Sequence, residues 1–320
     1  MILVTGCAGF IGSRVVESLL RRGEEVLGID NLNDSYNPRV KDWRLARFAE
    51  RDGFVWRQLD ITDRQGLGRL FDEHPFDAVI NMAARAGVRQ STEDPWAYYA
   101  TNVTGTLNLL ELCRASAVHK FVLASTSSIY GASDAQPLRE DALCDRPLSP
   151  YAASKKAAET LCHSYHHLYK LDVTILRYFT VYGPAGRPDM SIFRFVKWIT
   201  EGETLILYGD GSQERDFTFV EDVAAGTADA LKPVGFEVIN IGSDHPVSIN
   251  ETIAKLERML GRKAQIRQEP VQASDVPATW ADISKAKRML GWVPKTQFDD
   301  GLQQVVDWYA EHRAWAKDLL

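Results

Sequence analysis

A tyrosine and a lysine stand four positions apart in the segment Pro150-Tyr151-Ala152-Ala153-Ser154-Lys155. On a helix, this spacing places both side chains on one face, and the proline suits the first helical turn. A tyrosine that serves as a base must lose its proton far below its reference pKa of about 10, and a neighbouring ammonium favours the phenolate. The pair therefore predicts proton transfer at a substrate hydroxyl.

Four hydroxyl side chains follow the apolar run 120–124 and could hold the oxygen on which such a tyrosine acts. They are Ser125, Thr126, Ser127 and Ser128. The run is typical of a parallel strand buried on both faces, and open parallel sheets bind ligands at the carboxyl ends of their strands. Tyrosine and lysine are common on helix surfaces, so the pair gains its meaning from this cluster and from a glycine-rich loop near the N-terminus.

The glycine-rich loop lies between an expected strand and an expected helix. Strand 2–5 leads into Gly6-Cys7-Ala8-Gly9-Phe10-Ile11-Gly12, with the spacing GxxGxxG. The first glycine permits a tight turn, the second lets the backbone approach a pyrophosphate, and the third lets helix and strand pack closely. The helix N-terminus then presents N–H groups and a positive dipole end to the phosphates. The loop predicts a dinucleotide-binding site.

An aspartate at the end of the second expected strand indicates which dinucleotide binds. Asp30 can accept hydrogen bonds from both ribose hydroxyls of the adenosine half of NAD, and its charge would repel the 2′-phosphate of NADP. NAD is therefore the expected cofactor, and its positively charged nicotinamide ring would also favour the tyrosine phenolate. Asp60 and Ile61 end the third strand, where they are placed to meet adenine, although a simple helix cap explains Asp60 equally well.

The alternation of strands and helices predicts an α/β fold, namely a Rossmann-type doubly wound parallel sheet with a smaller C-terminal α+β substrate domain. We expect strands at 2–5, 25–29, 54–58, 78–81, 120–124, 173–176 and 236–241, and helices at 11–22, 41–50, 64–71, 96–115, 151–169, 250–260 and 302–319. After residue 177, Gly-Pro and Gly-Asp-Gly sequences interrupt the alternation of strands and helices and separate shorter elements. The expected domains are residues 1–178 for NAD, with residues 216–245 packing back onto them, and residues 179–320 for the substrate.

Composition argues against several other classes of protein. The chain carries 37 Lys and Arg against 43 Asp and Glu, whereas a nucleic-acid-binding protein normally has a basic bias. Four scattered cysteines, without CxxC spacing or paired histidines, predict reduced thiols and no metal site. No apolar stretch approaches the roughly 20 residues of a membrane span, and the N-terminus lacks a signal-peptide pattern. We expect a cytoplasmic protein with neither a membrane nor a nucleic acid as partner.

These motifs resemble those of the extended short-chain dehydrogenase/reductase family and, within it, the nucleotide-sugar 4-epimerases. The resemblance covers nearly the whole chain and rests on Thr5–Gly12, Ile29–Asn31, Ala83-Ala84, Asn102, Ser125–Gly131, Tyr151–Lys155, Arg215–Phe217 and Gly291-Trp292. It implies Tyr151 as the catalytic acid and base, Lys155 as the residue that adjusts its pKa, and Thr126 as their hydroxyl partner. Residues 179–320 are then expected to bind a nucleotide sugar.

The resemblance also implies two sets of binding residues. NAD contacts are expected from Gly6, Gly9, Phe10, Ile11, Gly12, Asp30, Asn31, Asp60, Ile61, Ala83, Ala84, Asn102, Tyr151, Lys155 and Tyr178. Contacts to a UDP-sugar are expected from Arg89, Thr126, Ser127, Ser128, Thr180, Arg187, Arg215 and Asp275.

Three strings are similar to the UDP-glucuronate 4-epimerase branch, and so is the stretch Asp30–Tyr36. They are Ala86–Arg89, Arg177–Pro184 and Gly186–Met190. Thr180 and Gln272 differ from the asparagine and arginine of UDP-galactose 4-epimerases, and Asn81 stands where many relatives carry a histidine. The resemblance implies oxidation of UDP-glucuronate at C4 to a 4-keto sugar, rotation of that sugar, and return of the hydride to its other face. The product would be UDP-galacturonate, without net redox change.

The 4-keto form of a glucuronate is a β-keto acid that can lose CO2, so its carboxylate must be held. Ser127, Ser128 and Thr180 could supply neutral hydrogen bonds, and Arg187 a charge. There are competing explanations for these residues: the hydroxyls could cap the end of the strand, and the arginine could be a solvated charge in a loop. The related 4,6-dehydratases carry an Asp-Glu pair at positions 127 and 128, and the decarboxylases a glutamate. With serine at both positions, no carboxylate is available there for elimination.

Several alternatives stay open from the sequence alone. A 4-epimerase acting on UDP-glucose and UDP-galactose, or on an N-acetylhexosamine, would use the same machinery. A UDP-glucuronate decarboxylase, a simple alcohol dehydrogenase and a non-catalytic NAD-binding protein are further candidates. Many members of the family form homodimers through four helices, and the resemblance implies that Trp96–Ala115 and Tyr151–Tyr169 supply them here.

Overall fold

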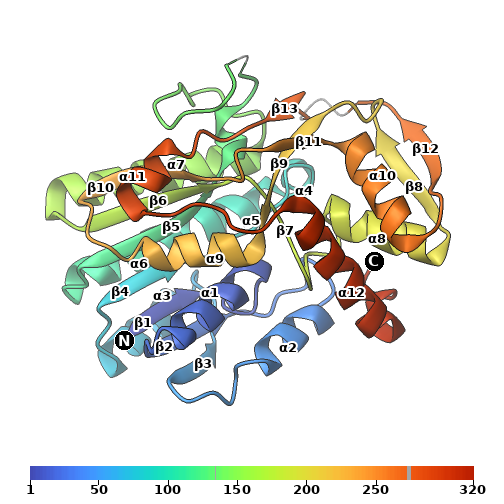
Figure 1. Ribbon diagram of the computed structural model, residues 1–320. Helices are drawn as coiled ribbons and strands as arrows, with labels where there is room; N and C mark the ends of the chain where they lie inside the picture. Colours follow the sequence, from blue (N-terminus) through green and yellow to red (C-terminus); the bar gives the residue numbers. More distant parts are fainter. Residues whose placement is uncertain (134, 272–274) are drawn as a thin grey trace.

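The computed structural model describes residues 1–133, 135–271 and 275–320, and a parallel sheet forms its centre (Figure 1). The strands lie in the order β10-β6-β5-β4-β1-β2-β3. Their bounds are β1 Ile2–Thr5, β2 Val26–Asp30, β3 Phe54–Gln58, β4 Ala78–Asn81, β5 Lys120–Thr126, β6 Asp172–Tyr178 and β10 Phe236–Ile241. Each neighbouring pair is parallel. The predicted Rossmann-type sheet is confirmed.

Helices cover both faces of this sheet. They are α1 Phe10–Arg21, α3 Arg64–Glu73, α6 Thr106–Ala115, α7 Pro150–Tyr169, α9 Val220–Asp229 and α11 Ser284–Leu290. On β5, Phe121 and Leu123 join the apolar core beneath α3, α6 and α7. Val122 and Ala124 join the opposite core, beneath α1, α9 and α11. Because successive strand residues point to opposite faces, burial on both faces produces the continuous apolar runs of the sequence.

A smaller region lies beside the sheet, on the right of Figure 1. Its strands are β7 Thr180–Tyr182, β8 Thr204–Tyr208, β9 Glu214–Phe219, β11 Pro246–Ser248, β12 Gln265–Glu269 and β13 Ala278–Thr279, and its helices α8 Ser191–Glu201, α10 Ile249–Leu260 and α12 Phe298–Ala316. The core of this region is aromatic, with Trp198, Phe217 and Trp308 all buried. Helix α2 (Arg39–Ala46) contributes Leu45 to the core beneath α1 and Val40 to this aromatic core, and so connects the two parts.

The chain returns to the central sheet before it ends. Strand β9 leads into α9, which packs beside α1, and β10 then pairs with β6 along its whole length. The return places residues 220–241 on the sheet although they follow β7 to β9 of the smaller region. Among the residues that the structure describes, no helix is both long and apolar enough to cross a bilayer.

The predicted helix at residues 96–115 is three segments in the structure. They are α5 Pro95–Tyr99, a π-helical turn Ala100–Gly105, and α6. The hydroxyl of Thr106, the first residue of α6, donates to the carbonyl of Asn102 in this turn at 2.7 Å. A π-helical turn inserts one extra residue into the helical repeat. Thr101 of this turn lines the cavity described below.

Candidate active site

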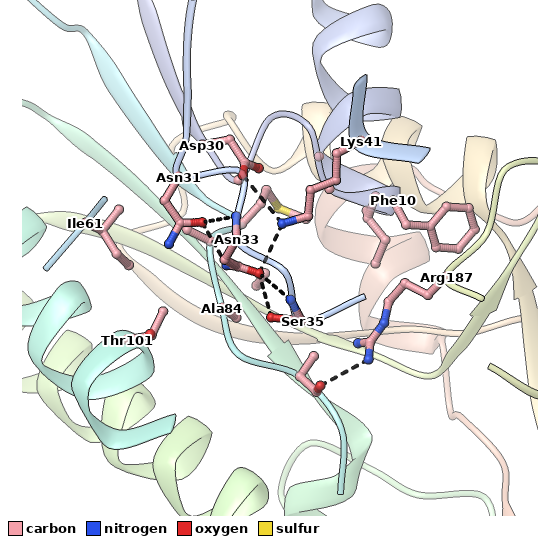
Figure 2. Close-up of a pocket in the computed structure, with 18 of the residues that line it drawn as sticks. Phe10, Asp30, Asn31, Asn33, Ser35, Lys41, Ile61, Ala84, Thr101 and Arg187 are labelled. Atoms are coloured by element: carbon pink, nitrogen blue, oxygen red, sulfur yellow. Dashed lines mark hydrogen bonds and ion pairs between the residues drawn. The ribbon is translucent and has the colours of Figure 1, made fainter. Parts of the chain in front are cut away.

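A cavity opens at the carboxyl ends of the strands, between β1 and β4. The strand order changes direction at this point, which is where open α/β sheets bind their ligands. The cavity has a volume of about 190 Å³. The predicted cofactor residues that line it are Gly6, Gly9, Phe10, Ile11, Gly12, Asp30, Asn31, Asp60, Ile61, Ala83, Ala84, Tyr151, Lys155 and Tyr178. Figure 2 shows how Asp30, Asn31, Ile61 and Ala84 surround it.

The glycine-rich loop packs backbone against backbone. Gly6 has a φ of 68°, which side chains rarely adopt, and a Cβ on it would lie 2.8 Å from the nitrogen of Ala83. A Cβ on Gly12 would lie 2.1 Å from the carbonyl oxygen of Gly6. Gly9, at the N-cap of α1, brings no side-chain cap. The helix end therefore presents bare N–H groups to the cavity, which fits a pyrophosphate.

Asp30 is fixed at one end of the cavity by the backbone. One oxygen of its carboxylate accepts from the N–H of Leu32 at 2.8 Å, and the other from the N–H of Ala8 at 3.1 Å. The side chain of Asn31 donates to Asp60 at 2.6 Å and so joins the ends of the second and third strands. Asp60 does not cap α3, because the N-cap of that helix is Asp63. Both acidic residues line the cavity, where the carboxylate of Asp30 fits the hydroxyls of a ribose.

Helix α7 carries Tyr151 and Lys155 into the cavity. Ser149 is its N-cap and accepts from the N–H of Ala152 at 3.2 Å, with Pro150 in the first turn as expected. The ring of Tyr98 meets the ring of Tyr151 edge-on, with 6.1 Å between the ring centres. Capping and ring packing thus fix the first turn of the helix and the direction of its tyrosine.

Replacing Ser149 with alanine is expected to lower the free energy of unfolding by about 1 kcal/mol, the usual cost of losing a side-chain N-cap. The loosened first turn carries Tyr151, so turnover should fall as well. Chemical denaturation and initial rates would measure both effects. Ser149→Asp keeps an acceptor at the cap and should keep most of the stability and the activity. An alanine variant as stable and active as the parent would show that the cap does not hold this turn.

The pKa values of the two side chains are displaced in opposite directions. Burial raises the pKa of Tyr151, while a hydrogen bond with Thr126 and the positive charge of Arg187 act against the rise. Burial lowers the pKa of Lys155 to about 8, although the negative charge of Glu159 opposes this. In this structure, Thr126 and Arg187 favour the phenolate, a role that the sequence assigned to Lys155.

Lys155 is backed by a buried ion pair that the sequence analysis missed. Glu159 accepts from Arg177 at 2.9 and 3.1 Å, and from the hydroxyl of Ser125 at 2.6 Å. These bonds attach α7 to β5 and β6 directly behind the lysine. The signal was present, because Glu159 follows Lys155 by four residues and so shares its helix face.

The hydroxyl cluster lies where β5 ends, two residues later than the apolar run suggested. Thr126 is the last strand residue, contacts Tyr151, and accepts from the N–H of Ser128 at 3.1 Å. Ser127 and Ser128 begin a single 3₁₀ turn, Ser127–Tyr130. Strand pairing with β6 as far as Tyr178 explains the longer strand. The structure therefore places Thr126 beside Tyr151 and the two serines just beyond it.

Asn102, which was expected to contact NAD, is not among the residues that line the cavity. It is 1% exposed, and its amide donates to the carbonyl of Arg85 at 3.0 Å and to the hydroxyl of Ser154 at 2.9 Å. Its oxygen accepts from the N–H of Arg85 at 2.9 Å. These contacts occupy the side-chain amide with protein groups. Asn102 instead holds the loop after β4 against α7.

Arg187 and Thr180 line a second cavity, which adjoins the first. Phe10 and Arg187 are common to the walls of both. The guanidinium of Arg187 binds Asp189 at 2.6 Å and the carbonyl of Ala86 at 3.1 Å, and its side chain is 18% exposed. It is therefore a fixed, mostly buried charge and not a solvated loop arginine.

Three predicted substrate residues, Arg89, Arg215 and Asp275, gather where the segment after β4 meets the smaller region. Arg89 binds Asp275 at 3.1 Å, and the charge of Asp275 acts on Arg215, whose pKa is lowered by burial. Arg89 also lies over the ring of Tyr208, 4.2 Å from its centre. Gln272, which neighbours this cluster in the sequence, lies outside the described residues. Paired arginines and an aromatic ring suit a nucleoside diphosphate.

Arg194 and Tyr208 were not predicted for this cluster. Arg194 lies on α8, stacks on Trp198 with 4.4 Å to the ring centre, and acts electrostatically with Tyr208 and Arg89. Burial lowers its pKa. Its Nε is buried and has no protein partner among the described residues. Arg194 follows the matched string Gly186–Met190 closely, which was the one signal available in the sequence.

Comparison with known proteins agrees with this geometry. A family model described as GDP-mannose 4,6 dehydratase matches residues 3–305. A UDP-glucuronate 4-epimerase of Thermodesulfobacterium geofontis is 54% identical over 99% of this chain and 98% of its own length.

Solved structures are similar over the whole chain as well. A UDP-glucuronic acid 4-epimerase from Bacillus cereus, in complex with UDP-glucuronic acid and NAD, is 38% identical and has a TM-score of 0.92 over 97% of this chain and 99% of its own. A UDP-glucose 4-epimerase from Thermotoga maritima, with UDP-glucose, is 32% identical and has a TM-score of 0.91 over 98% and 99% of the two chains. The chain belongs to this family of nucleotide-sugar dehydratases and 4-epimerases, within the extended short-chain dehydrogenase/reductases.

Proposed function

We propose that this protein is an NAD-dependent epimerase that inverts C4 of UDP-glucuronate and so forms UDP-galacturonate. The observation that carries the proposal is the meeting of Tyr151 and Arg187 on the wall of one cavity. The charge of each acts on the other, and Thr126 completes the group. A sugar that brings its 4-hydroxyl to Tyr151 can thus bring its carboxylate towards a buried cation. The relatives that bind UDP-glucuronic acid and NAD support this assignment.

The chain supplies binding, orientation and proton transfer. The glycine-rich loop fits the pyrophosphate of NAD, Asp30 fits a ribose, and bound NAD would supply a hydride acceptor and donor. The Tyr151 phenolate takes the proton of the 4-hydroxyl while Thr126 holds that oxygen. Loss of the hydrogen at C4 as a hydride to that acceptor would then leave a ketone at C4 of the sugar. After the sugar has presented its other face, Tyr151 gives the proton back. Arg89, Arg215 and Tyr208 fit the UDP portion, which stays bound meanwhile.

The carboxylate must be kept out of line with the ketone, or CO2 leaves. Arg187 supplies the charge for this, and Thr180 shares its cavity. Ser127 and Ser128 lie next to Thr126 and offer only neutral hydrogen bonds. Since neither is a carboxylate, they provide no base for the elimination that a dehydratase performs. The family to which the chain belongs is nevertheless described by its GDP-mannose 4,6 dehydratase members.

A 4-epimerase of UDP-glucose is the second candidate, favoured by the close fit to the Thermotoga maritima structure. Both candidates can be tested with purified protein and no added NAD, incubated separately with UDP-glucuronate and UDP-glucose. Proton NMR should show UDP-galacturonate from the first and little change in the second. Conversion of UDP-glucose alone would favour the second candidate, and a pentose product would mean that the serines had been misinterpreted.

We further propose a homodimer that forms through α5, α6 and α7. Trp96, Leu168 and Tyr169 on these helices are 83, 63 and 50% exposed, which is unusual for large apolar side chains and typical of an interface. Sedimentation of the parent and of Trp96→Glu would test this assembly. The domain division at residue 178 and the cytoplasmic location stay predictions from the sequence.

A further inference from the structure

A buried arginine on α2 has no role in the mechanism above. Arg44 is 2% exposed, and among the residues that the structure describes no carboxylate forms an ion pair with its guanidinium. Burial lowers its pKa, and the nearby charges of Arg14 and Arg187 lower it further, although Tyr36 acts against this. A buried charge without an ionic partner is costly to a fold unless other groups bind it. The neutral groups that bind Arg44 therefore keep it in place.

Two of its bonds go to one carbonyl in the loop that leads to Arg187. Nε and Nη2 of Arg44 donate to the carbonyl oxygen of Ala185 at 3.0 and 2.7 Å. Ala185 has a φ of 55°, a conformation that residues with a side chain rarely adopt. Strain of this kind persists only where the surrounding groups fix it. Arg44 thus holds a strained turn just before Arg187 in the chain.

A tyrosine ring connects Arg44 to Arg187 a second time. Nη1 of Arg44 donates to the hydroxyl of Tyr36 at 2.8 Å and to the carbonyl of Ala8 at 3.3 Å. The guanidinium carbons of Arg44 and Arg187 lie 5.5 and 5.8 Å from the centre of the Tyr36 ring, distances at which a guanidinium is attracted to an aromatic face. Tyr36 is therefore held by Arg44 and contacts Arg187, and both Tyr36 and Arg187 line the cavity (Figure 2).

We propose that Arg44 is the positioning residue that aims Arg187 at the carboxylate of the sugar. It acts through the turn at Ala185 and the ring of Tyr36, since Arg44 is not among the described residues that line either cavity. The proposal rests on the proposed function, in which Arg187 holds that carboxylate. Because the pairing of a guanidinium with a carboxylate depends on its geometry, a loosened loop should weaken binding of the carboxylate before it weakens binding of the nucleotide.

Two consequences distinguish this role from a general contribution to the fold. UDP-glucuronate and UDP-glucose differ only at C6, which is a carboxylate in the first and a hydroxymethyl group in the second. Loss of Arg44 should therefore reduce the affinity for the first sugar selectively.

The second consequence concerns the 4-keto sugar, which should lose CO2 more often once its carboxylate is poorly held. In that loss the bond between C5 and the carboxylate breaks, its electron pair enters an enolate, and C5 takes a proton from water. Return of the hydride to C4 would then complete a UDP-pentose. A variant in which the fold alone is weakened would form less product without this change in its identity.

Calorimetry can compare the two affinities in the Tyr151→Phe background, where neither sugar is converted. This background should bind UDP-glucuronate more tightly than UDP-glucose. Arg44→Met should reduce that preference by about tenfold, the effect of one modest charge interaction. Arg44→Lys should reduce it similarly, because a lysine keeps the charge but lacks the fork of N–H groups that binds Ala185. With Tyr151 present, proton NMR should show a larger share of pentose from both variants.

Arg47→Met is the matched control. Arg47 follows the last residue of α2, binds Glu17 at 2.7 Å, and has a side chain that is 39% exposed. The control removes one positive charge near the same helix without touching the loop before Arg187. It should therefore keep the preference for UDP-glucuronate and the share of pentose at the parent values.

Retained NAD and the thermal unfolding temperature show which variants are folded, and Arg44→Lys decides alone if Arg44→Met is not. An unchanged preference in a folded variant would overturn the proposal, as would full recovery in Arg44→Lys or an equal loss of affinity for both sugars. An Arg44→Lys protein that cannot retain NAD would also overturn it, because the arginine would then serve the whole fold. A parent that does not prefer UDP-glucuronate would instead count against the proposed function.

Discussion

Replacing Tyr151 with phenylalanine should reduce turnover of the UDP-sugar by on the order of 10³-fold or more, because only the acid and base is removed. The ring would keep its packing against Tyr98, and the nucleotide site formed by the glycine-rich loop would be unchanged. We therefore expect the thermal unfolding temperature and the amount of retained NAD to match those of the parent. Initial rates with UDP-glucuronate, measured beside these two quantities, would separate loss of chemistry from loss of structure.

Tyr165→Phe is the control for this substitution. Tyr165 lies on the same helix, and its hydroxyl donates to Glu111 at 2.5 Å, on α6 and outside the walls of both cavities. This variant should turn over at nearly the parent rate. A Tyr151→Phe protein that keeps a tenth of the parent rate would mean that another group carries the proton.

Replacing Lys155 with methionine should make the protein less active and, at neutral pH, more stable. Turnover should fall by at least about a hundredfold, because the lysine side chain that lines the cavity beside Tyr151 and fits the nicotinamide ribose is lost. Burial holds the pKa of Lys155 at about 8 in the folded protein, against 10.5 as the reference. Keeping this ammonium charged inside the fold therefore costs roughly 3 kcal/mol of folding free energy at pH 7. Methionine has similar length and no charge to bury.

The effect on stability should depend on pH in a defined direction. Between about pH 8 and 10.5 the unfolded chain holds this proton more tightly than the folded protein does. The contribution of Lys155 to the free energy of unfolding therefore rises with pH through this window and is lowest below it. The advantage of Lys155→Met should consequently be full at pH 7 and much smaller at pH 10.

Denaturant unfolding at both pH values would measure this difference. Lys156→Met is the matched control, since Lys156 is the next residue, is 34% exposed, and also lies near Glu159, at 3.7 Å. It should bring no gain in stability at pH 7. A Lys155→Met protein less stable than the parent at pH 7 would show that the attraction of Glu159 outweighs the cost of burial.

The sequence predicted the central sheet closely because a strand that is buried on both faces appears in the sequence as a continuous run of apolar residues. Strands 2–5, 54–58, 78–81 and 236–241 begin and end where their apolar runs do. No comparable local pattern marks the break in the expected helix 96–115. The π-helical turn is held by contacts of Asn102 with Arg85 and Ser154, which are distant in the sequence.

The residues of the candidate site likewise fall into those that the sequence predicts and those that it does not. Gly6, Gly12, Asp30, Tyr151 and Lys155 were predictable because each belongs to a short motif with a fixed spacing. Residues that act through the fold were not predictable, since α8 and β8 carry Arg194 and Tyr208 to the site from separate parts of the chain. The pairing of Arg187 with Asp189 likewise became visible only once the loop was folded.

The most direct test of the account follows the hydrogen at C4. UDP-glucuronate that carries deuterium at C4 is incubated with purified protein in ordinary water, without added NAD, and the UDP-galacturonate formed is analysed by NMR and mass spectrometry. If the hydride leaves and returns within one closed site, the product keeps its deuterium at C4. Loss of the deuterium to water, or formation of a pentose with release of CO2, would contradict the proposed epimerisation.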